Sequence, residues 1–266
     1  MQKLQISADS IKGKRTKNED SYSVLRLGRH SHLLAIADGM GGAQKGDYAS
    51  HIILKEIEHY LKLLFKKKVE RNDLKYILAE CFKLAQSRLR NEFLEDENLK
   101  GMGTTMTAVL IHKKCYAWGN LGDSRIYRMS EGAMHQITED HTYIQEYLKN
   151  SKKKISEKIL DQYSHILNKA IDGGKDEPDI FPEEEPYVDL KEGDLFLLCS
   201  DGLIINKADD LSGTFRTFIQ KSEEIKNEEQ KSEQDENQAD SDVKTKEEKE
   251  NQKILPEEQS IQSDDA

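Results

Sequence analysis

The chain has 266 residues, a formal net charge of −10 and a hydrophobic fraction of only 36%. Most of the charge lies after residue 219, where 16 Asp and Glu residues stand against 7 Lys. Residues 1–219 are therefore close to neutral, which argues against a nucleic-acid-binding protein because such proteins carry a basic face. No apolar run approaches the ~18 residues of a membrane span, so we expect no membrane association.

The composition predicts two parts with different properties. Residues 1–219 are long enough to bury a sizeable hydrophobic core and form one expected domain. Residues 220–266 repeat Glu, Lys, Gln, Asp and Ser, so we expect an acidic disordered tail. That tail is either a solubilising extension or a segment that attracts basic partners. The three cysteines are far apart in apolar contexts, which suits a reducing compartment and predicts a cytoplasmic protein, which we expect to be a monomer.

Apolar periodicity predicts the elements in chain order. The expected strands cover residues 4–8, 22–27, 33–37, 106–111, 115–121, 126–129, 134–137 and 195–199. Two amphipathic helices are expected at 47–65 and 72–94, the second capped by Asn72, and weaker helical patterns lie at 143–171 and 211–219. We expect the residues between 171 and 194 to form an exposed connection. Consecutive short strands followed by paired helices place the chain in the α+β class with mostly antiparallel sheets.

Two of the predicted strands end alike, in an Asp followed by a Gly. The strand over 33–37 leads into Asp38-Gly39, and the strand over 195–199 leads into Ser200-Asp201-Gly202. The Gly lets the backbone bend, so its carbonyl can approach whatever the Asp binds. Two such ends, brought together, form an all-oxygen site suited to Mg²⁺ or Mn²⁺. Either Asp alone would be an ordinary turn residue, because Asp-Gly is a common turn pair.

Six short motifs within residues 5–205 resemble, in order and spacing, metal-dependent protein phosphatases of type 2C, in their bacterial branch. They are Arg15-x-x-Asn18-Glu19-Asp20, Ala37-Asp38-Gly39-Met40-Gly41-Gly42, Gly103-Thr104-Thr105, Gly119-Asn120-Leu121-Gly122-Asp123-Ser124-Arg125, Thr138-x-Asp140-His141 and Cys199-Ser200-Asp201-Gly202-Leu203. The resemblance implies a central antiparallel β-sandwich flanked by helix pairs, in four α/β/β/α layers. It makes residues 1–219 a phosphatase-like catalytic domain.

The resemblance also implies an activity. It predicts a serine/threonine phosphoprotein phosphatase that hydrolyses phosphomonoesters through a metal-bridging water or hydroxide. The cofactors would be two Mn²⁺ or Mg²⁺ ions, with a third, weaker site. Two such cations lower the pKa of a bridging water and steady an in-line attack. The partners would be phosphoserine and phosphothreonine proteins and a cognate serine/threonine kinase, which implies a role in signalling.

Carried over residue by residue, the resemblance assigns catalytic roles to Arg15, Asp38 and Asp201. Asp38 would bridge both cations, the Gly39 carbonyl would bind one of them and Asp201 the other. Arg15 would hold the substrate phosphate, because a guanidinium offers the bidentate hydrogen bonds that an ammonium cannot. Arg15 also has basic neighbours, so a general basic surface is an alternative for it.

The remaining metal residues implied by the resemblance are Glu19, Asp20 and Asp123. Glu19 and Asp20 would act mostly through metal-bound waters, although such a pair in a loop is usually only solvated. Asp123 would belong to the third, weaker metal site, or would instead make a structural pair with Arg125.

The Gly103-Thr104-Thr105 and Thr138-x-Asp140-His141 motifs carry polar residues that we expect to be structural. Thr104 and Thr105 read as packing or turn residues. His141 has a side chain suited to general acid catalysis, but a structural role is the expectation.

The family's pattern ends with an Asp-Asn pair and a final strand, for which we find no counterpart. Asp209 and Asp210 follow Asp201 too soon, and Ile254-Leu255 is too short for the strand. Losing a carboxylate should weaken metal binding, and losing an inner strand exposes a sheet edge. Three explanations stay open: an enzyme of weakened activity, a non-catalytic pseudophosphatase that binds or regulates phosphoproteins, or an unusual ligand from the tail.

Overall fold

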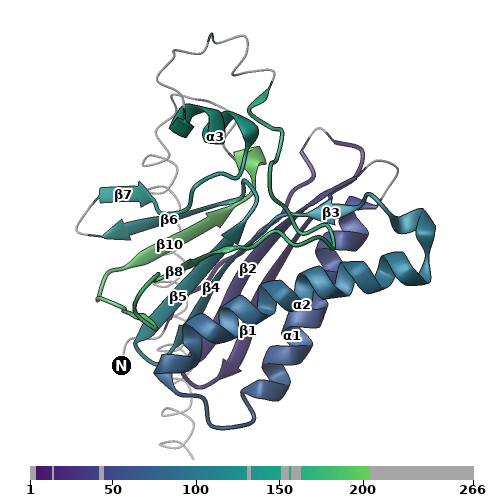
Figure 1. Ribbon diagram of the computed structural model, residues 1–266. Helices are drawn as coiled ribbons and strands as arrows, with labels where there is room; N and C mark the ends of the chain where they lie inside the picture. The colour runs from purple at the N-terminus through teal and green to yellow at the C-terminus, as the bar shows by residue number, and fades with distance from the viewer. Residues whose placement is uncertain are drawn as a thin grey trace, which may run out of the picture. The chain divides into compact units, whose positions relative to one another are not determined.

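The computed structural model describes residues 4–13, 15–41, 45–130, 133–150, 156 and 163–203 (Figure 1). The domain boundary at residue 219, the acidic tail and the short helix over 211–219 all lie outside these residues. So do Asp209, Asp210 and the Ile254-Leu255 pair.

Two antiparallel sheets form the centre of the described structure. The larger sheet has seven strands, with β1 (Asp20–Gly28), β2 (Ser31–Met40), β4 (Met106–His112), β5 (Cys115–Leu121) and β8 (Asp179–Phe181) in that order, β3 (Gly103–Thr104) beside β2 and β9 (Val188–Asp189) beside β5. The smaller sheet has the order β10 (Leu195–Cys199), β6 (Arg125–Ser130) and β7 (Ala133–Gln136). Tight connections join β1 to β2 and β4 to β5, and β6 pairs with the next strand, β7, as the spacing of the turns predicts.

Two helices cover one face of the larger sheet (Figure 1). They are α1 (Gly46–Leu64) and α2 (Leu74–Glu95), whose apolar stripes include Ile53, Leu61 and Leu78, all fully buried. The side chains of β2 alternate between the two faces of the sheet, and small residues such as Ala35 and Ala37 face the helices. The small side chains let α1 lie close against the strand that carries Asp38.

The opposite face of the larger sheet packs against the smaller sheet. Val109 and Trp118 of the larger sheet join Ile126 of β6 and Phe196 of β10 in a second apolar cluster. Tyr116 meets Phe196 edge to face, with ring centroids 4.9 Å apart. The sheets therefore form the expected β-sandwich. Within the described residues, α3 (Tyr143–Asn150) follows β7, and no second helix pair is seen.

The prediction of a strand over residues 4–8 is wrong. These residues have no regular structure, and Leu4 is 43% exposed. No strand in the described ranges pairs with this segment. An alternating pattern forms a strand only where a neighbour satisfies its backbone hydrogen bonds.

The segment between residues 143 and 194 also differs from the expectation. The described helix ends at Asn150, and Leu167 and Ile171 instead form isolated antiparallel bridges with Thr142 and Thr104. The expected exposed connection contains β8 and β9, which both pair with β5. These strands are two or three residues long, so their partner and not their own pattern defines them.

The start of α2 was also predicted incorrectly at one residue. Asn72 is not its cap, because it lies inside a 3₁₀ turn over Arg71–Asp73 that precedes the helix. The Asp73 carboxylate accepts the Glu70 N–H at 2.9 Å and closes this turn. The other expected strands and helices form close to their predicted bounds. None of the described helices is both long and apolar enough to cross a membrane.

Gly119 provides a test of the packing between α2 and the larger sheet. A Cβ at this position would lie 2.6 Å from Phe82 Cε2 and 2.8 Å from Ile180 Cδ1. We expect Gly119→Ala to lower the free energy of unfolding by about 1–3 kcal/mol through overpacking, as measured by urea denaturation. Combined with Phe82→Leu, it should cost less than the sum of the two single substitutions. Strict additivity would contradict this account of the contact.

Candidate active site

Asp20 and Asp38 face each other across the first two strands. They are directly paired in the antiparallel register of β1 and β2. Opposite residues of such a pair project from the same face, with Cβ atoms about 4.5–5.5 Å apart. By the alternation of β2, this is the face that carries Leu34 toward the smaller sheet. Asp38 is thus not in a turn after the strand, because β2 continues to Met40.

The smaller sheet brings the other two aspartates to the same end of the sandwich. Cys199 of β10 pairs with Arg125 of β6, so the segments beyond these residues lie side by side. One segment holds Asp201, and the other holds Asp123 in the loop between β5 and β6. Ser200 Oγ donates a hydrogen bond to Asp20 Oδ2 at 2.9 Å, which ties the end of β10 to the start of β1.

Burial and the neighbouring carboxylates raise the pKa values of Asp38 and Asp123. Burial raises the pKa of Asp38 to about 8, with further contributions from the negative charges of Asp20, Asp201 and Asp123 and an opposing one from Arg15. Burial likewise raises the pKa of Asp123 to about 6, together with Asp201 and Asp140. Gathered acidic groups whose pKa values rise in this way mark a site that favours positive charge.

A close approach between two glycines places Glu19 and the Gly39 carbonyl beside this cluster. The Gly39 N–H donates to the Glu19 carbonyl at 3.1 Å. A Cβ on Gly46 would lie 2.8 Å from Glu19 Oε1 and 2.8 Å from the Gly39 oxygen, and one on Gly39 would lie 2.0 Å from the Gly46 oxygen. Only glycine fits at both positions, so the start of α1 can lie directly against β2 and the Glu19 side chain.

Arg15 lies at the rim of the cluster. Its guanidinium is 3.7 Å from the Glu19 carboxylate, and its side chain is 60% exposed. Its positive charge also acts on Asp38. The loop that carries it is anchored by Lys17, which pairs with Asp47 of α1 at 2.6 Å. Arg15 is thus held near the carboxylates while its side chain stays open to a ligand.

The structural alternative for Asp123 is wrong. Arg125 instead binds Asp140 with two donors, Nε at 2.8 Å and Nη2 at 2.6 Å. No side chain within the described ranges forms an ion pair with Asp123. Asp123 therefore remains available to the cluster.

His141 has the structural role that we expected. Its Nδ1 accepts the Gly122 N–H at 3.1 Å, and its Nε2 lies 3.0 Å from Asp179 Oδ2. Both ring nitrogens are thus occupied, and only 7% of the residue is exposed. The ring fixes the Gly122 end of the Asp123 loop.

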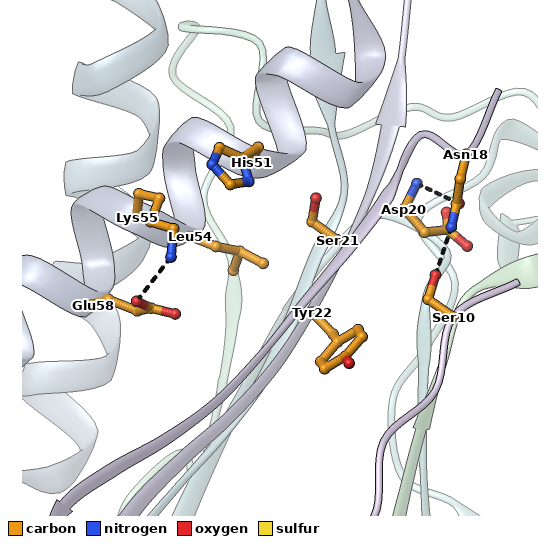
Figure 2. A pocket seen from close by; sticks show the side chains of 9 residues that line it. All are labelled: Ser10, Asn18, Asp20, Ser21, Tyr22, His51, Leu54, Lys55 and Glu58. Atoms are coloured by element: carbon orange, nitrogen blue, oxygen red, sulfur yellow. Dashed lines mark hydrogen bonds and ion pairs between the residues drawn. The ribbon is translucent and has the colours of Figure 1, made fainter. Parts of the chain in front are cut away.

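A shallow hollow adjoins the cluster on the side of α1. Figure 2 shows Asp20 and Asn18 at one end of it and Lys55 and Glu58 at the other, with Tyr22 of β1 between them. Asn18 Oδ1 accepts the Asp20 N–H at 3.1 Å and fixes the entry to β1. This side chain orients the loop that carries Glu19, a role that the sequence did not reveal.

The donor set fits a hard divalent cation. The groups at this end of the sandwich are carboxylates and a backbone carbonyl, which Mg²⁺ and Mn²⁺ prefer. Among the described residues, no three His, Cys, Asp or Glu side chains are gathered closely enough to hold an ion by themselves. A cation bound here would therefore need water or backbone oxygens to complete its coordination shell.

Comparison with known proteins places the chain among phosphatases. A family model described as "Protein phosphatase 2C" matches residues 9–239. The serine/threonine protein phosphatase PstP of Mycobacterium tuberculosis is 32% identical over 202 residues, which make up 75% of this chain and 36% of PstP. The serine/threonine phosphatase Stp of Listeria welshimeri is 30% identical over 197 residues, 71% of this chain and 73% of Stp. This chain therefore spans about a third of PstP and about three quarters of Stp.

Solved structures agree in fold. The catalytic domain of PstP in complex with two manganese ions aligns with a TM-score of 0.60 at 31% identity, over 74% of this chain and 76% of that one. The serine/threonine phosphatase of S. agalactiae aligns with a TM-score of 0.59 at 26% identity, over 73% and 77% of the two chains. The α+β sandwich is thus confirmed, and the chain belongs to the bacterial branch of the protein phosphatase 2C family.

Proposed function

We propose that this protein is a metal-dependent serine/threonine phosphoprotein phosphatase. One observation carries the proposal: Asp20, Asp38, Asp123 and Asp201 gather at one end of the sandwich, with Arg15 at the rim. Asp20, Asp38 and Asp123 are partly buried and Asp201 is exposed. Such a concentration of negative charge is costly unless cations neutralise it. The phosphatase names of the relatives support the same reaction. Neither the site nor the relatives favours the non-catalytic alternative.

Each residue has a role in the proposal. Asp38, the Gly39 carbonyl and Asp201 would hold two Mn²⁺ or Mg²⁺ ions, Glu19 and Asp20 would act through water, and Asp123 would serve a third, weaker site. When bound, the two cations supply charge neutralisation and an activated water. The two manganese ions in the PstP structure support this count.

Arg15 would bind the substrate phosphate. Its exposed guanidinium can donate two parallel hydrogen bonds to phosphate oxygens, which fixes the phosphorus relative to the carboxylate cluster. Holding the ester in this way supplies much of the catalysis of phosphoryl transfer, which depends on positioning and charge stabilisation.

The wider assignments are part of the same proposal. The substrates would be phosphoserine and phosphothreonine proteins, including a cognate kinase, in a signalling pathway. The protein would act as a monomer in the cytoplasm. Its three free, buried cysteines support a reducing compartment. The boundary of the catalytic domain at residue 219 rests on composition alone, since the family match continues to residue 239.

Hydrolysis of a phosphothreonine peptide tests the activity. We expect phosphate release by the wild type with Mn²⁺ and none with a chelator or in Asp38→Ala. Arg15→Lys should lower kcat/KM about tenfold to a hundredfold, since a hydrogen bond to a charged group contributes ~1.5–3 kcal/mol. Arg26→Lys, an equivalent change on the exposed face of β1, should leave kcat/KM unchanged. A wild type that is inactive at millimolar Mn²⁺ would refute the proposal.

The pH dependence of stability tests the repulsion between the carboxylates. The pKa of Asp38 is about 8 in the folded state against an ordinary 3.8, so between these pH values the folded state binds more protons than the unfolded state. The metal-free protein should therefore lose stability as pH rises from about 4 to about 8. In EDTA, Asp38→Asn should melt near the wild-type temperature at pH 5 and above it at pH 8.

Glu97→Gln is the control for this experiment, because Glu97 is an exposed carboxylate whose one ion pair within the described ranges is with Lys100. It should follow the wild type at both pH values. If Asp38→Asn brings no gain in melting temperature at pH 8, the carboxylates do not repel one another as described.

A further inference from the structure

Two buried hydroxyl groups meet behind the carboxylate cluster. Thr105 Oγ1 lies 2.8 Å from Ser124 Oγ, and the two residues are 2% and 0% exposed. A hydroxyl at such a site costs free energy unless it is hydrogen-bonded, and a Val and an Ala would fill nearly the same space without that cost. The pair therefore calls for an explanation beyond packing.

The first partner of this pair holds the backbone of Asp38. Thr105 Oγ1 accepts the Asp38 N–H at 3.0 Å, and the Thr105 N–H donates to the Asp38 carbonyl at 2.8 Å. Thr104 Oγ1 donates to the same carbonyl at 2.9 Å. Both peptide groups of Asp38 are thus fixed by the short break between β3 and β4.

The second partner belongs to the loop that carries Asp123. Gly122 has a φ of +118° and packs directly on Thr105, since a Cβ there would lie 2.5 Å from Thr105 Cγ2. Ser124 follows Asp123 and contacts the Thr105 hydroxyl. The loop therefore rests on both the methyl and the hydroxyl group of Thr105.

We propose that Thr105 is a positioning residue that joins Asp38 to the Asp123 loop, with Ser124 as its partner. Its hydroxyl is the one group that contacts both the Asp38 backbone and the Asp123 loop among the hydrogen bonds of the described chain. It fixes the spacing of two carboxylates against their mutual repulsion. This inference rests on the proposed function, because the property that it controls is the affinity for divalent cations.

Thr107 supplies the matched comparison for a merely structural role. It lies two residues further along the chain, inside β4, and is fully buried like Thr105. Among the hydrogen bonds of the described residues, its hydroxyl makes only a long contact of 3.4 Å to the Gly119 carbonyl, away from the cluster. Thr105→Val and Thr107→Val therefore remove the same group from similar surroundings.

The experiment is a calorimetric titration of Mn²⁺ into the full chain, with the urea midpoint in EDTA measured in parallel. We expect Thr105→Val to weaken Mn²⁺ binding about tenfold or more, in the range of losses for groups that orient metal ligands. Thr105→Ser should restore most of the affinity, and Thr107→Val should keep it. Ser124→Ala should weaken binding less, and its effect should not add to that of Thr105→Val.

Each outcome decides between the ideas. The inference is overturned if Thr105→Val binds Mn²⁺ as Thr107→Val does, or if Thr105→Ser brings no recovery. If Thr105→Val does not fold, the Ser124→Ala and Thr105→Ser titrations still decide. If the wild type itself binds no Mn²⁺, the metal centre of the proposed function is refuted. That result needs no variant, so it can be told apart from a failure of the inference about Thr105.

Discussion

Repulsion between carboxylates is the constraint on which the rest of this structure depends. Asp38 lies among three other aspartates and is partly removed from water, which raises its pKa to about 8. Without other constraints, Asp38 would move away from the other carboxylates or stay protonated. The fold prevents the first outcome by fixing the backbones of Asp20 and Asp38, and a divalent cation would prevent the second. The site is thus held ready at the expense of stability.

The sandwich achieves this with segments that are distant in sequence. The hairpin of β1 and β2 sets Asp20 against Asp38, and the pairing of β10 with β6 brings Asp201 beside the Asp123 loop. The apolar cluster between the sheets, with Phe196 against Tyr116, fixes the smaller sheet over the larger one. The site therefore depends on packing far from the carboxylates, as ligand sites on rigid strands usually do.

Local patterns were sufficient to predict most of this arrangement. The apolar runs before Asp38 and Asp201 defined their strands, and the order of the motifs identified the family. The strands β8 and β9 were missed because they are too short to show a period, and only their partner β5 fixes them.

Side-chain pairing was harder to predict than the strands. The sequence places Asp123 two residues from Arg125, but the folded chain gives that guanidinium to Asp140. Nor could it show that the Thr105 hydroxyl serves Asp38, since the contact joins residues 67 positions apart. Such contacts depend on the register between strands, which a local pattern does not record.

The most direct test of this account is the anomalous diffraction of crystals grown with Mn²⁺. The account predicts strong anomalous peaks beside Asp38, with Asp201 and the Gly39 carbonyl among the nearest groups. A map without anomalous density among these carboxylates at saturating Mn²⁺ would contradict it, because their gathering would then have no cation to explain it.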